Sequence, residues 1–216
     1  MNEFLSNLQF SILTAFVCMM GVRTLHLRRN KAVNAFTLAS EDEGIKRILQ
    51  PTLVVIVVVW IVLMYLNLRG PDVQILPSVL ETNLVNSTAF KVVGATSVVL
   101  GFVVYTFAWT GLGNSWRVGI DRSSPGMLVT GGVYRISRNP IYVFINIYFA
   151  GTFLMNGSLI LLCFAVATPF NLHWLILGEE RFLSKTFGLS FHNYCAKTKR
   201  YWTFYRKTED TPRIDN

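Results

Sequence analysis

Long apolar runs alternate with short basic connections along most of this chain. A helix needs about 20 apolar residues to cross the hydrocarbon core of a bilayer. Runs that approach or exceed this length cover residues 4–27, 48–68, 90–112, 140–155 and 158–179. The pattern therefore predicts an all-α integral membrane protein with five transmembrane helices.

The last two runs form a predicted helical hairpin, because only an Asn-Gly-Ser turn at residues 156–158 separates them. Asn139 is a favourable N-cap residue, and Pro140 suits the first position of a helix. The helix that starts at Pro140 rises about 24 Å to residue 155, and the return helix rises about 31 Å to Glu179. We therefore expect the Asn139 end of the fourth helix to meet Glu179 and Glu180 on one side of the membrane.

The composition agrees with a membrane protein and narrows its partners. Hydrophobic residues make up 52% of the 216 residues, and the formal net charge is +8. In a membrane protein such a charge indicates basic cytoplasmic connections and contact with anionic lipid headgroups. Nothing in it points to nucleic acid. The three cysteines have no paired spacing, so we expect neither a disulfide framework nor a metal site.

The distribution of lysine and arginine predicts the orientation. These residues are concentrated after the first, third and fifth runs. Five spans with the N-terminus outside place this charge, and the candidate site, in the cytoplasm. The chain is then a single membrane domain of residues 1–216. Residues 1–112 hold three anchor helices, residues 113–205 form a cofactor-binding catalytic core with the helical hairpin, and residues 206–216 form a polar tail.

Two polar edges are expected to face each other across the cytoplasmic end of the hairpin. Glu179 and Glu180 close the predicted fifth helix, where Arg181 or Lys185 would neutralise them if they have no other role. Alternatively, one carboxylate faces a pocket, because adjacent helical residues point about 100° apart. A carboxylate there would favour a nearby cationic centre. On the opposite edge, beside Arg138, the free N–H groups of the fourth helix would attract an anion.

Other polar positions allow two interpretations each. His173 lies seven residues before Glu180 and so on nearly the same helix face. It is either a hydrogen-bonded histidine of the membrane core or part of a substrate cavity, because polar groups at that depth tend to be functional. Gly131 and Gly132 either form an ordinary turn or let the backbone come close to a ligand.

The order of the polar motifs resembles the isoprenylcysteine carboxyl methyltransferase and phospholipid methyltransferase superfamily. The string G-V-Y-R-x-x-R-N-P-x-Y covers residues 132–142, E-E-x-x-L-x-x-x-F-G covers residues 179–188, and Y-x-x-K-T-x-R covers residues 194–200. The apolar hairpin lies between the first two strings, and a G-N-S-W stretch precedes them at residues 113–116. The resemblance extends over about residues 112–200. It is fairly specific for the superfamily and poorly specific for the substrate.

The resemblance implies an S-adenosylmethionine-dependent integral membrane methyltransferase, with a helical bundle and a cytosolic segment that caps the cofactor. Its expected cofactor-binding residues are Leu128, Val129, Gly132, Tyr134, Arg138, Asn139, Pro140, Tyr142, Glu179 and Glu180. Arg200 matches the arginine of the superfamily that handles the acceptor, so Arg200 and Glu180 are the candidate catalytic residues. Trp116 and His173 are the candidate lining of the substrate cavity.

Methyl transfer from a sulfonium requires alignment and a dry site rather than a nucleophilic residue or a metal. The expected acceptor is lipid-like or amphipathic, with either an isoprenylcysteine-type carboxylate or a phospholipid amine as the methylated group. A carboxylate would need a cation such as Arg200, whereas an amine would need a base, for which His192 is the candidate.

Two departures weaken the narrower assignment to prenylated-protein carboxyl methylation. The isoprenylcysteine enzymes usually carry histidine where this chain has Asn139, and proline where Tyr201 follows the terminal arginine. Two alternatives stay open: an NADPH-dependent membrane sterol or enone reductase of related fold, and a non-catalytic membrane protein.

Overall fold

The computed structural model describes residues 2–31, 36–37, 55, 57–63, 65, 77, 79–80, 82–113, 118–119 and 127–202. Within this part the elements are α1 (Asn2–Lys31), β1 (Phe36–Thr37), α3 (Thr88–Leu112), β2 (Val118–Gly119), the 3-10 helix η2 (Gly132–Arg135), α4 (Pro140–Asn156), α5 (Leu159–Phe187) and α6 (Leu189–Lys197). Residues 57–63 are also helical. Apart from the parallel pairing of the two-residue strands β1 and β2, the described structure is helical, as expected.

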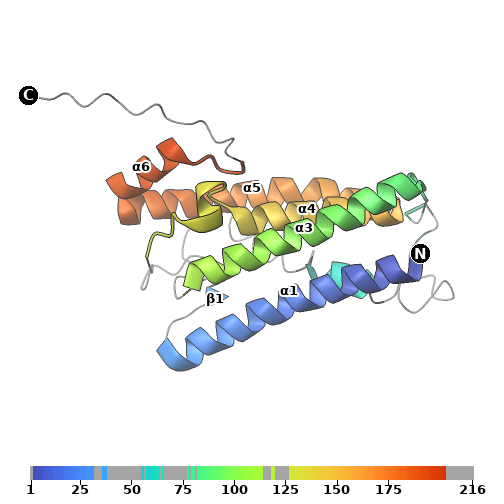
Figure 1. The fold of residues 1–216 in the computed structure, drawn as a ribbon, viewed down its shortest axis with the longest axis horizontal. Helices are drawn as coiled ribbons and strands as arrows, with labels where there is room; N and C mark the ends of the chain where they lie inside the picture. The colour runs from blue at the N-terminus through green and yellow to red at the C-terminus, as the bar shows by residue number, and fades with distance from the viewer. Residues whose placement is uncertain are drawn as a thin grey trace, which may run out of the picture.

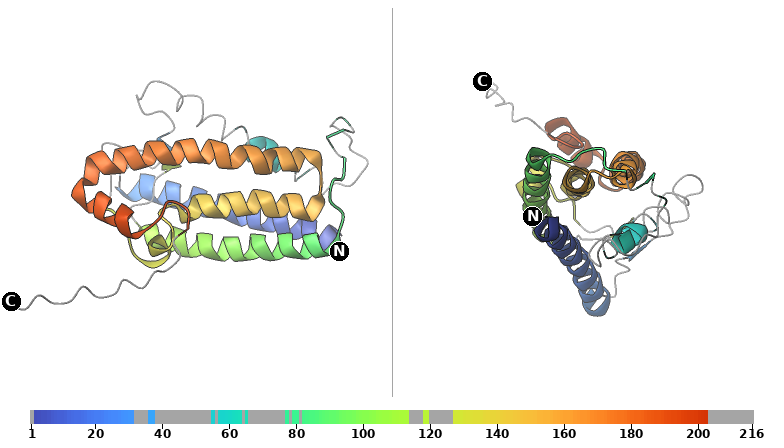
Figure 2. Two further views of the ribbon diagram at one scale, coloured as in Figure 1. Left: turned by 90° about the horizontal axis from the view of Figure 1, so that it is seen from above. Right: turned by 90° about the vertical axis from the view of Figure 1, so that its right-hand side faces the viewer.

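The long helices form a bundle whose axes run along the length of the molecule (Figure 1). Helices α3, α4 and α5 lie side by side, while α1 diverges from α3 toward its C-terminal end (Figure 2). Among the described residues, three helices are long and apolar enough to cross a membrane: Asn2–His26, Thr88–Leu112 and Leu159–Phe187. Helix α4 is apolar but shorter, and the run at residues 48–68 lies largely outside the described residues.

A tight turn reverses the chain between α4 and α5. Gly157 ends α4 with φ 74°, a left-handed conformation that glycine adopts without a steric cost. A Cβ atom at Gly157 would also overlap the carbonyl oxygen of Val85. The segment before α3 pairs with this turn, because Leu84 N–H donates to Gly157 O at 2.7 Å and Leu159 N–H donates to Thr82 O at 3.2 Å. The turn is therefore fixed from both sides.

Glycines allow α3 and α4 to approach closely. A Cβ atom at Gly94 would lie 2.5 Å from the carbonyl oxygen of Gly151, and one at Gly151 would lie 2.5 Å from Cγ2 of Val98. Small residues at such crossings let the backbones of membrane helices come into contact. This crossing holds α4, which begins at the candidate site, against α3.

An aromatic core joins the helices. Tyr105 of α3, Phe16 of α1 and Phe144 of α4 pack with ring centroids 4.8–5.4 Å apart. Trp60, which is fully buried, packs on Phe149 at 4.4 Å. At such distances aromatic pairs add to the stabilisation from buried area alone.

A polar contact crosses from α1 to the far end of α4. The Asn156 amide donates to Oε1 of Gln9 at 2.9 Å, and the Tyr148 hydroxyl donates to the Gln9 carbonyl oxygen at 3.0 Å. Gln9 is fully buried, so these bonds satisfy polar groups that would otherwise be costly inside an apolar bundle. The start of α1 therefore lies at the same end as the turn, opposite the candidate site.

The helix bounds correct one expectation. The α5 helix does not end at Glu179 and Glu180 but continues for about two more turns to Phe187. Gly188, with φ 50°, is both the C-cap of α5 and the N-cap of α6. The acidic pair therefore lies within a helix, and its side chains are held by neighbouring turns rather than by a loose helix end.

Candidate functional site

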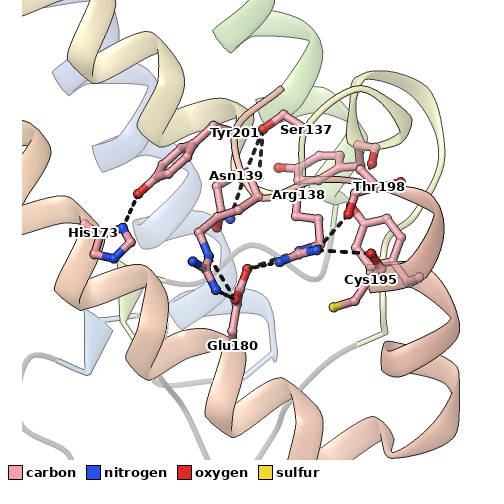
Figure 3. A network of polar contacts seen from close by, with 11 residues as sticks. Ser137, Arg138, Asn139, His173, Glu180, Cys195, Thr198 and Tyr201 are labelled. Carbon is pink, nitrogen blue, oxygen red and sulfur yellow. Dashed lines mark hydrogen bonds and ion pairs between the residues drawn. The ribbon is translucent and has the colours of Figure 1, made fainter. Parts of the chain in front are cut away.

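Glu180 is the centre of a polar network that joins three separate segments of the chain (Figure 3). One carboxylate oxygen, Oε1, accepts from Arg138 Nε at 3.1 Å and Nη2 at 2.7 Å. The other, Oε2, accepts from Arg200 Nε at 3.0 Å and Nη2 at 2.6 Å. The side chains of Glu180 and Arg138 are only 13% and 11% exposed, and that of Arg200 is 30% exposed. Such two-point contacts between guanidinium and carboxylate are among the stronger polar contacts in proteins.

The network shows which cations neutralise Glu180 of the acidic pair. Arg138, which precedes α4, and Arg200, near the end of the described chain, neutralise Glu180 in place of its sequence neighbours Arg181 and Lys185. Hydrogen bonding to Glu180 raises the pKa of Arg200 above its ordinary value. Two cations on one carboxylate leave the network with one surplus positive charge.

The residues from 198 to 201, here called the strap, return across the start of α4. Arg138 N–H donates to Lys199 O at 3.0 Å, and its Nη1 donates to Thr198 O at 2.7 Å. The carbonyl oxygen of Arg200 accepts from Ser137 Oγ at 3.2 Å and from Asn139 Nδ2 at 3.1 Å. Backbone and side-chain bonds together fix the position of the strap.

The strap also explains the role that Asn139 has in the fold. Pro140 takes the first turn of α4, as expected, but the Asn139 side chain makes no capping bond. Its amide binds the strap instead, and the Asn139 N–H donates to Ser137 Oγ at 3.0 Å. The prediction that the Asn139 side chain caps α4 is therefore wrong. The side-chain amide donates to a carbonyl oxygen of the strap and does not accept from the N–H groups at the start of the helix.

Glu179 takes a different partner from Glu180. Its Oε1 accepts a short hydrogen bond from the hydroxyl of Tyr142, one turn into α4. Neighbouring helical positions point about 100° apart, so the two carboxylates face different surroundings. Glu180 is paired with two cations, whereas Glu179 accepts a hydrogen bond from a neutral hydroxyl.

His173 contacts the strap from the side of α5. Its Nδ1 lies 2.6 Å from the hydroxyl oxygen of Tyr201, the residue that follows Arg200 (Figure 3). Burial raises the pKa of Tyr201, so its hydroxyl stays protonated and can donate to the imidazole. The structure shows a hydrogen-bonded His173, and its place in the lining of a substrate cavity stays a prediction.

A small apolar cluster lies beside this network. Leu128 and Val129 pack against buried Tyr134 and Tyr194. The Tyr194 hydroxyl donates to the Tyr134 carbonyl oxygen at 2.7 Å, and burial raises the pKa of both tyrosines. Gly132 has φ 59°, a conformation that favours glycine, and opens η2. Leu128 and Val129, two of the expected cofactor-binding residues, are thus near Tyr134 in an apolar environment.

The remaining expectations have mixed outcomes. Trp116 lies outside the described residues. Among the residues that the structure describes, no group of three or more His, Cys, Asp or Glu side chains could hold a metal ion. His192, the candidate base, lies 3.2 Å from Ser184 Oγ through its Nε2.

Sequence reasoning missed the residues that hold the strap. Ser137 donates to the strap through its Oγ, Thr198 of the strap donates from its Oγ1 to the Arg135 carbonyl oxygen, and Tyr201 of the strap contacts His173 of α5. Thr198 was present in the third motif without an assigned role. Tyr201 was considered only because the superfamily usually has proline at that position. Its hydroxyl makes a hydrogen bond to His173 that a proline side chain could not make.

Comparison with known proteins agrees with the resemblance read from the motifs. Residues 89–190 match the family model described as phospholipid methyltransferase. The match begins in α3 and includes α4, the whole of α5 and the start of α6. No curated protein matches the chain. Residues 89–190, just under half of the chain, are therefore similar to the phospholipid methyltransferase family, which is consistent with the superfamily resemblance, and the long apolar helices indicate an integral membrane protein.

Proposed function

We propose that this protein is an S-adenosylmethionine-dependent methyltransferase that acts on a lipid-like or amphipathic acceptor at the cytoplasmic surface of a membrane. The observation that carries the proposal is the bridge from Arg138 through Glu180 to Arg200. It unites the three motifs of the resemblance, because Arg138 and Arg200 lie 42 and 20 positions from Glu180 in the sequence. The family match supplies the reaction class, methyl transfer.

The side chains at this end of the bundle fit the chemistry of S-adenosylmethionine. That molecule carries a sulfonium and an ammonium, which suit the carboxylate of Glu179, and a carboxylate, which suits the surplus charge of the Arg138 and Arg200 pair. Leu128 and Val129 offer an apolar surface for a purine. When bound, the cofactor supplies the methyl group. The protein contributes alignment and a site from which water is excluded.

Arg200 is the proposed contact for the acceptor. Its Nε and Nη2 bind Glu180, which fixes the plane of the guanidinium, while the side chain remains partly exposed. A guanidinium held in this way can direct its remaining N–H groups to an oxygen of the acceptor without losing side-chain entropy at the moment of binding. Glu180 then acts mainly by holding Arg200 in place.

We also propose the five-span topology with the N-terminus outside. Three candidate spans and the shorter apolar α4 support it, together with the apolar run at residues 48–68. The start of α1 and the turn at Gly157 share one end of the bundle, and the site lies at the other. With that orientation the site faces the cytoplasm, where most lysine and arginine residues of the sequence are expected.

The cofactor is tested by thermal unfolding of the full chain in detergent. S-adenosylhomocysteine should raise the midpoint, because a ligand that binds only the folded state stabilises it. NADPH should leave the midpoint unchanged. A shift with NADPH alone would favour the reductase, and no shift with either ligand would favour a non-catalytic protein.

The acceptor contact is tested by transfer of a labelled methyl group into a total membrane lipid extract. Arg200→Lys should lower turnover at least about tenfold, some 1.4 kcal/mol of barrier, because lysine cannot reproduce the two-point contact. The matched control is Lys199→Gln, whose exposed side chain can change while its backbone contact to Arg138 remains. Equal, small losses in both variants would remove Arg200 from the reaction.

A further inference from the structure

Three buried oxygen atoms on α4 and α5 have no role in the site described above. They are Oδ1 of Asn146 on α4, and Oγ1 of Thr168 and Oδ1 of Asn171 on α5. Within the part of the chain that the structure describes, none of them has a hydrogen-bond partner. Thr168 is fully buried and Asn171 is 7% exposed. A buried polar atom without a partner costs folding free energy, so its presence in a native protein calls for an explanation.

The spacing along α4 places Asn146 on the face by which this helix meets α5. Tyr142, Asn146 and Phe149 follow one another at intervals of four and three residues, so they share one face of the helix. The Tyr142 hydroxyl bonds to Glu179 of α5. Phe149 stacks on Phe164 of α5, with ring centroids 6.2 Å apart. Asn146 lies between these two contacts, about 6 Å farther along the helix than Tyr142, and therefore faces α5.

The facing side of α5 repeats this spacing. Phe164, Thr168 and Asn171 also follow at intervals of four and three residues, so Thr168 and Asn171 continue the face that contacts α4 toward the candidate site. Asn171 lies eight residues before Glu179, which is about 12 Å along the helix. The hydrocarbon core takes about 20 residues of α5 counted from Leu159, so the three oxygens lie at the depth of the apolar layer.

A proline in the same stretch of α5 removes a backbone donor. Pro169 lies inside the helix and has no N–H, so the helical hydrogen bond to the carbonyl oxygen of Ala165 cannot form. In membrane helices, neighbouring side chains or waters usually supply such a carbonyl oxygen with a donor. The Thr168 hydroxyl does not do so, because it has no partner among the described residues. Donors rather than acceptors are therefore what this stretch lacks.

These atoms indicate the chemistry of a group that would bind them. An amide carbonyl oxygen accepts hydrogen bonds and cannot donate, so a group that satisfies both asparagines must offer an O–H or an N–H. The three side chains are uncharged, and a charged group at this depth would be costly without a counter-charge. An ester has acceptor oxygens only and would leave both amide oxygens unpaired. An uncharged hydroxyl or amide group fits.

We propose that Asn146 and Asn171 are specificity-determining residues for the methyl acceptor, and that they bind an uncharged hydroxyl or amide group in its membrane-buried part. The proposal rests on the proposed function, to which it adds a second polar group of the acceptor, deeper in the bundle than the methylated one. Thr168 bonds to the same group through its hydroxyl. Acceptors whose buried part has only ester linkages are disfavoured, because the two amide oxygens would remain without a donor.

The test compares two neutral probes of equal chain length as inhibitors of methyl transfer into a total membrane lipid extract. N-dodecylacetamide has an amide N–H, whereas dodecyl acetate has an ester at the same position and no donor. The amide should inhibit the wild-type full chain at least about tenfold more strongly than the ester, because a site that bonds an N–H rejects the analogue without it. Equal inhibition by the two probes would overturn the proposal.

Substitutions show whether the asparagines cause this preference. Asn146→Leu and Asn171→Leu should each abolish most of it, because leucine has a similar volume and no oxygen. The matched control is Thr152→Val, which removes a fully buried hydroxyl of α4 that already donates to the Phe149 carbonyl oxygen at 2.9 Å. This control should retain the preference for the amide. The proposal would be overturned if both leucine variants kept the preference, or if the control lost it as well.

Thermal unfolding in detergent separates this proposal from the proposed function. N-dodecylacetamide should raise the wild-type midpoint more than dodecyl acetate does, even without a methyl donor. The leucine variants should be no less stable than wild type, because they remove oxygens that have no partner, and a lower midpoint in both would show a structural role and overturn the proposal. A wild-type protein that transfers no methyl group contradicts the proposed function, whereas a midpoint that responds equally to the two probes contradicts the role of Asn146 and Asn171.

Discussion

Glu180→Gln is the substitution that tests the polar network most directly. The carboxylate accepts four hydrogen bonds, two from each arginine. Glutamine has one oxygen and one N–H₂ group, so the N–H₂ group would face a guanidinium as donor against donor. Both Arg138 and Arg200 would also lose their counter-charge.

The expected loss in the free energy of unfolding for each variant follows from the burial of the side chain and from the partners that remain. Breaking a buried ion pair costs about 3–5 kcal/mol, and exposed pairs contribute about 0–1 kcal/mol. Glu180 and Arg138 are nearly buried, so Glu180→Gln should lower the free energy of unfolding by about 3 kcal/mol. Arg138→Gln should cost about 2–3 kcal/mol, since its bonds to the carbonyl oxygens of Thr198 and Cys195 are lost as well. Arg200→Gln should cost about 1 kcal/mol, because it is more exposed and leaves Glu180 paired with Arg138.

The assay is reversible denaturant unfolding in detergent, followed by tryptophan fluorescence. The double variant Glu180→Gln with Arg200→Gln should be no less stable than Glu180→Gln alone, since Arg200 has no carboxylate to lose in that background. The reasoning would be refuted if Arg200→Gln cost as much as Glu180→Gln, or if the two effects simply added.

Three further outcomes follow from other parts of the structure. Gly157→Ala should destabilise the protein more than Gly188→Ala: both have positive φ, but only a Cβ at Gly157 meets neighbouring backbone, and paired thermal unfolding curves would show the order. Tyr201→Phe should lower turnover several-fold with S-adenosylhomocysteine affinity unchanged, since it frees the strap from α5; calorimetry beside the activity assay separates the two, and unchanged turnover would contradict the contact. Cys195 should be alkylated by iodoacetamide with a midpoint above the ordinary thiol pKa, because burial raises its pKa and the thiolate forms only at higher pH; a pH series read by mass spectrometry would expose a lower midpoint.

The hydropathy pattern predicted the helices well because their apolar lengths and their breaking residues are local properties. The start of α4 at Pro140 and its end at the turn before α5 were both readable from residue types. The end of α5 at the acidic pair was predicted wrongly. Glu179 and Glu180 were taken as the helix end, but charged residues continue a helix readily once it leaves the apolar layer.

The sequence predicted that the two polar edges meet at one end of the hairpin, but it did not predict how their side chains pair. The hairpin lengths brought Arg138 and Glu180 to the same end, and the structure places them in contact. The sequence could not show that Arg200 would share the same carboxylate, because that contact depends on the path of the strap. The amide of Asn139 and the hydroxyl of Tyr201 choose that path through tertiary hydrogen bonds, which leave no periodic trace in the sequence.

The close crossing of α3 and α4 also determines which substitutions evolution can reach at that point. An added methyl group at Gly151 would meet the Cγ2 atom of Val98, a side chain that a prior change to alanine would remove; the next obstacle is the Gly94 carbonyl oxygen at 2.9 Å. At Gly94 the first obstacle, at 2.5 Å, is the carbonyl oxygen of Gly151, and no side-chain change elsewhere can remove a backbone atom. At position 151, a change of Val98 would therefore remove the first of two obstacles to a residue larger than glycine. Position 94 can change only if the two helices move apart.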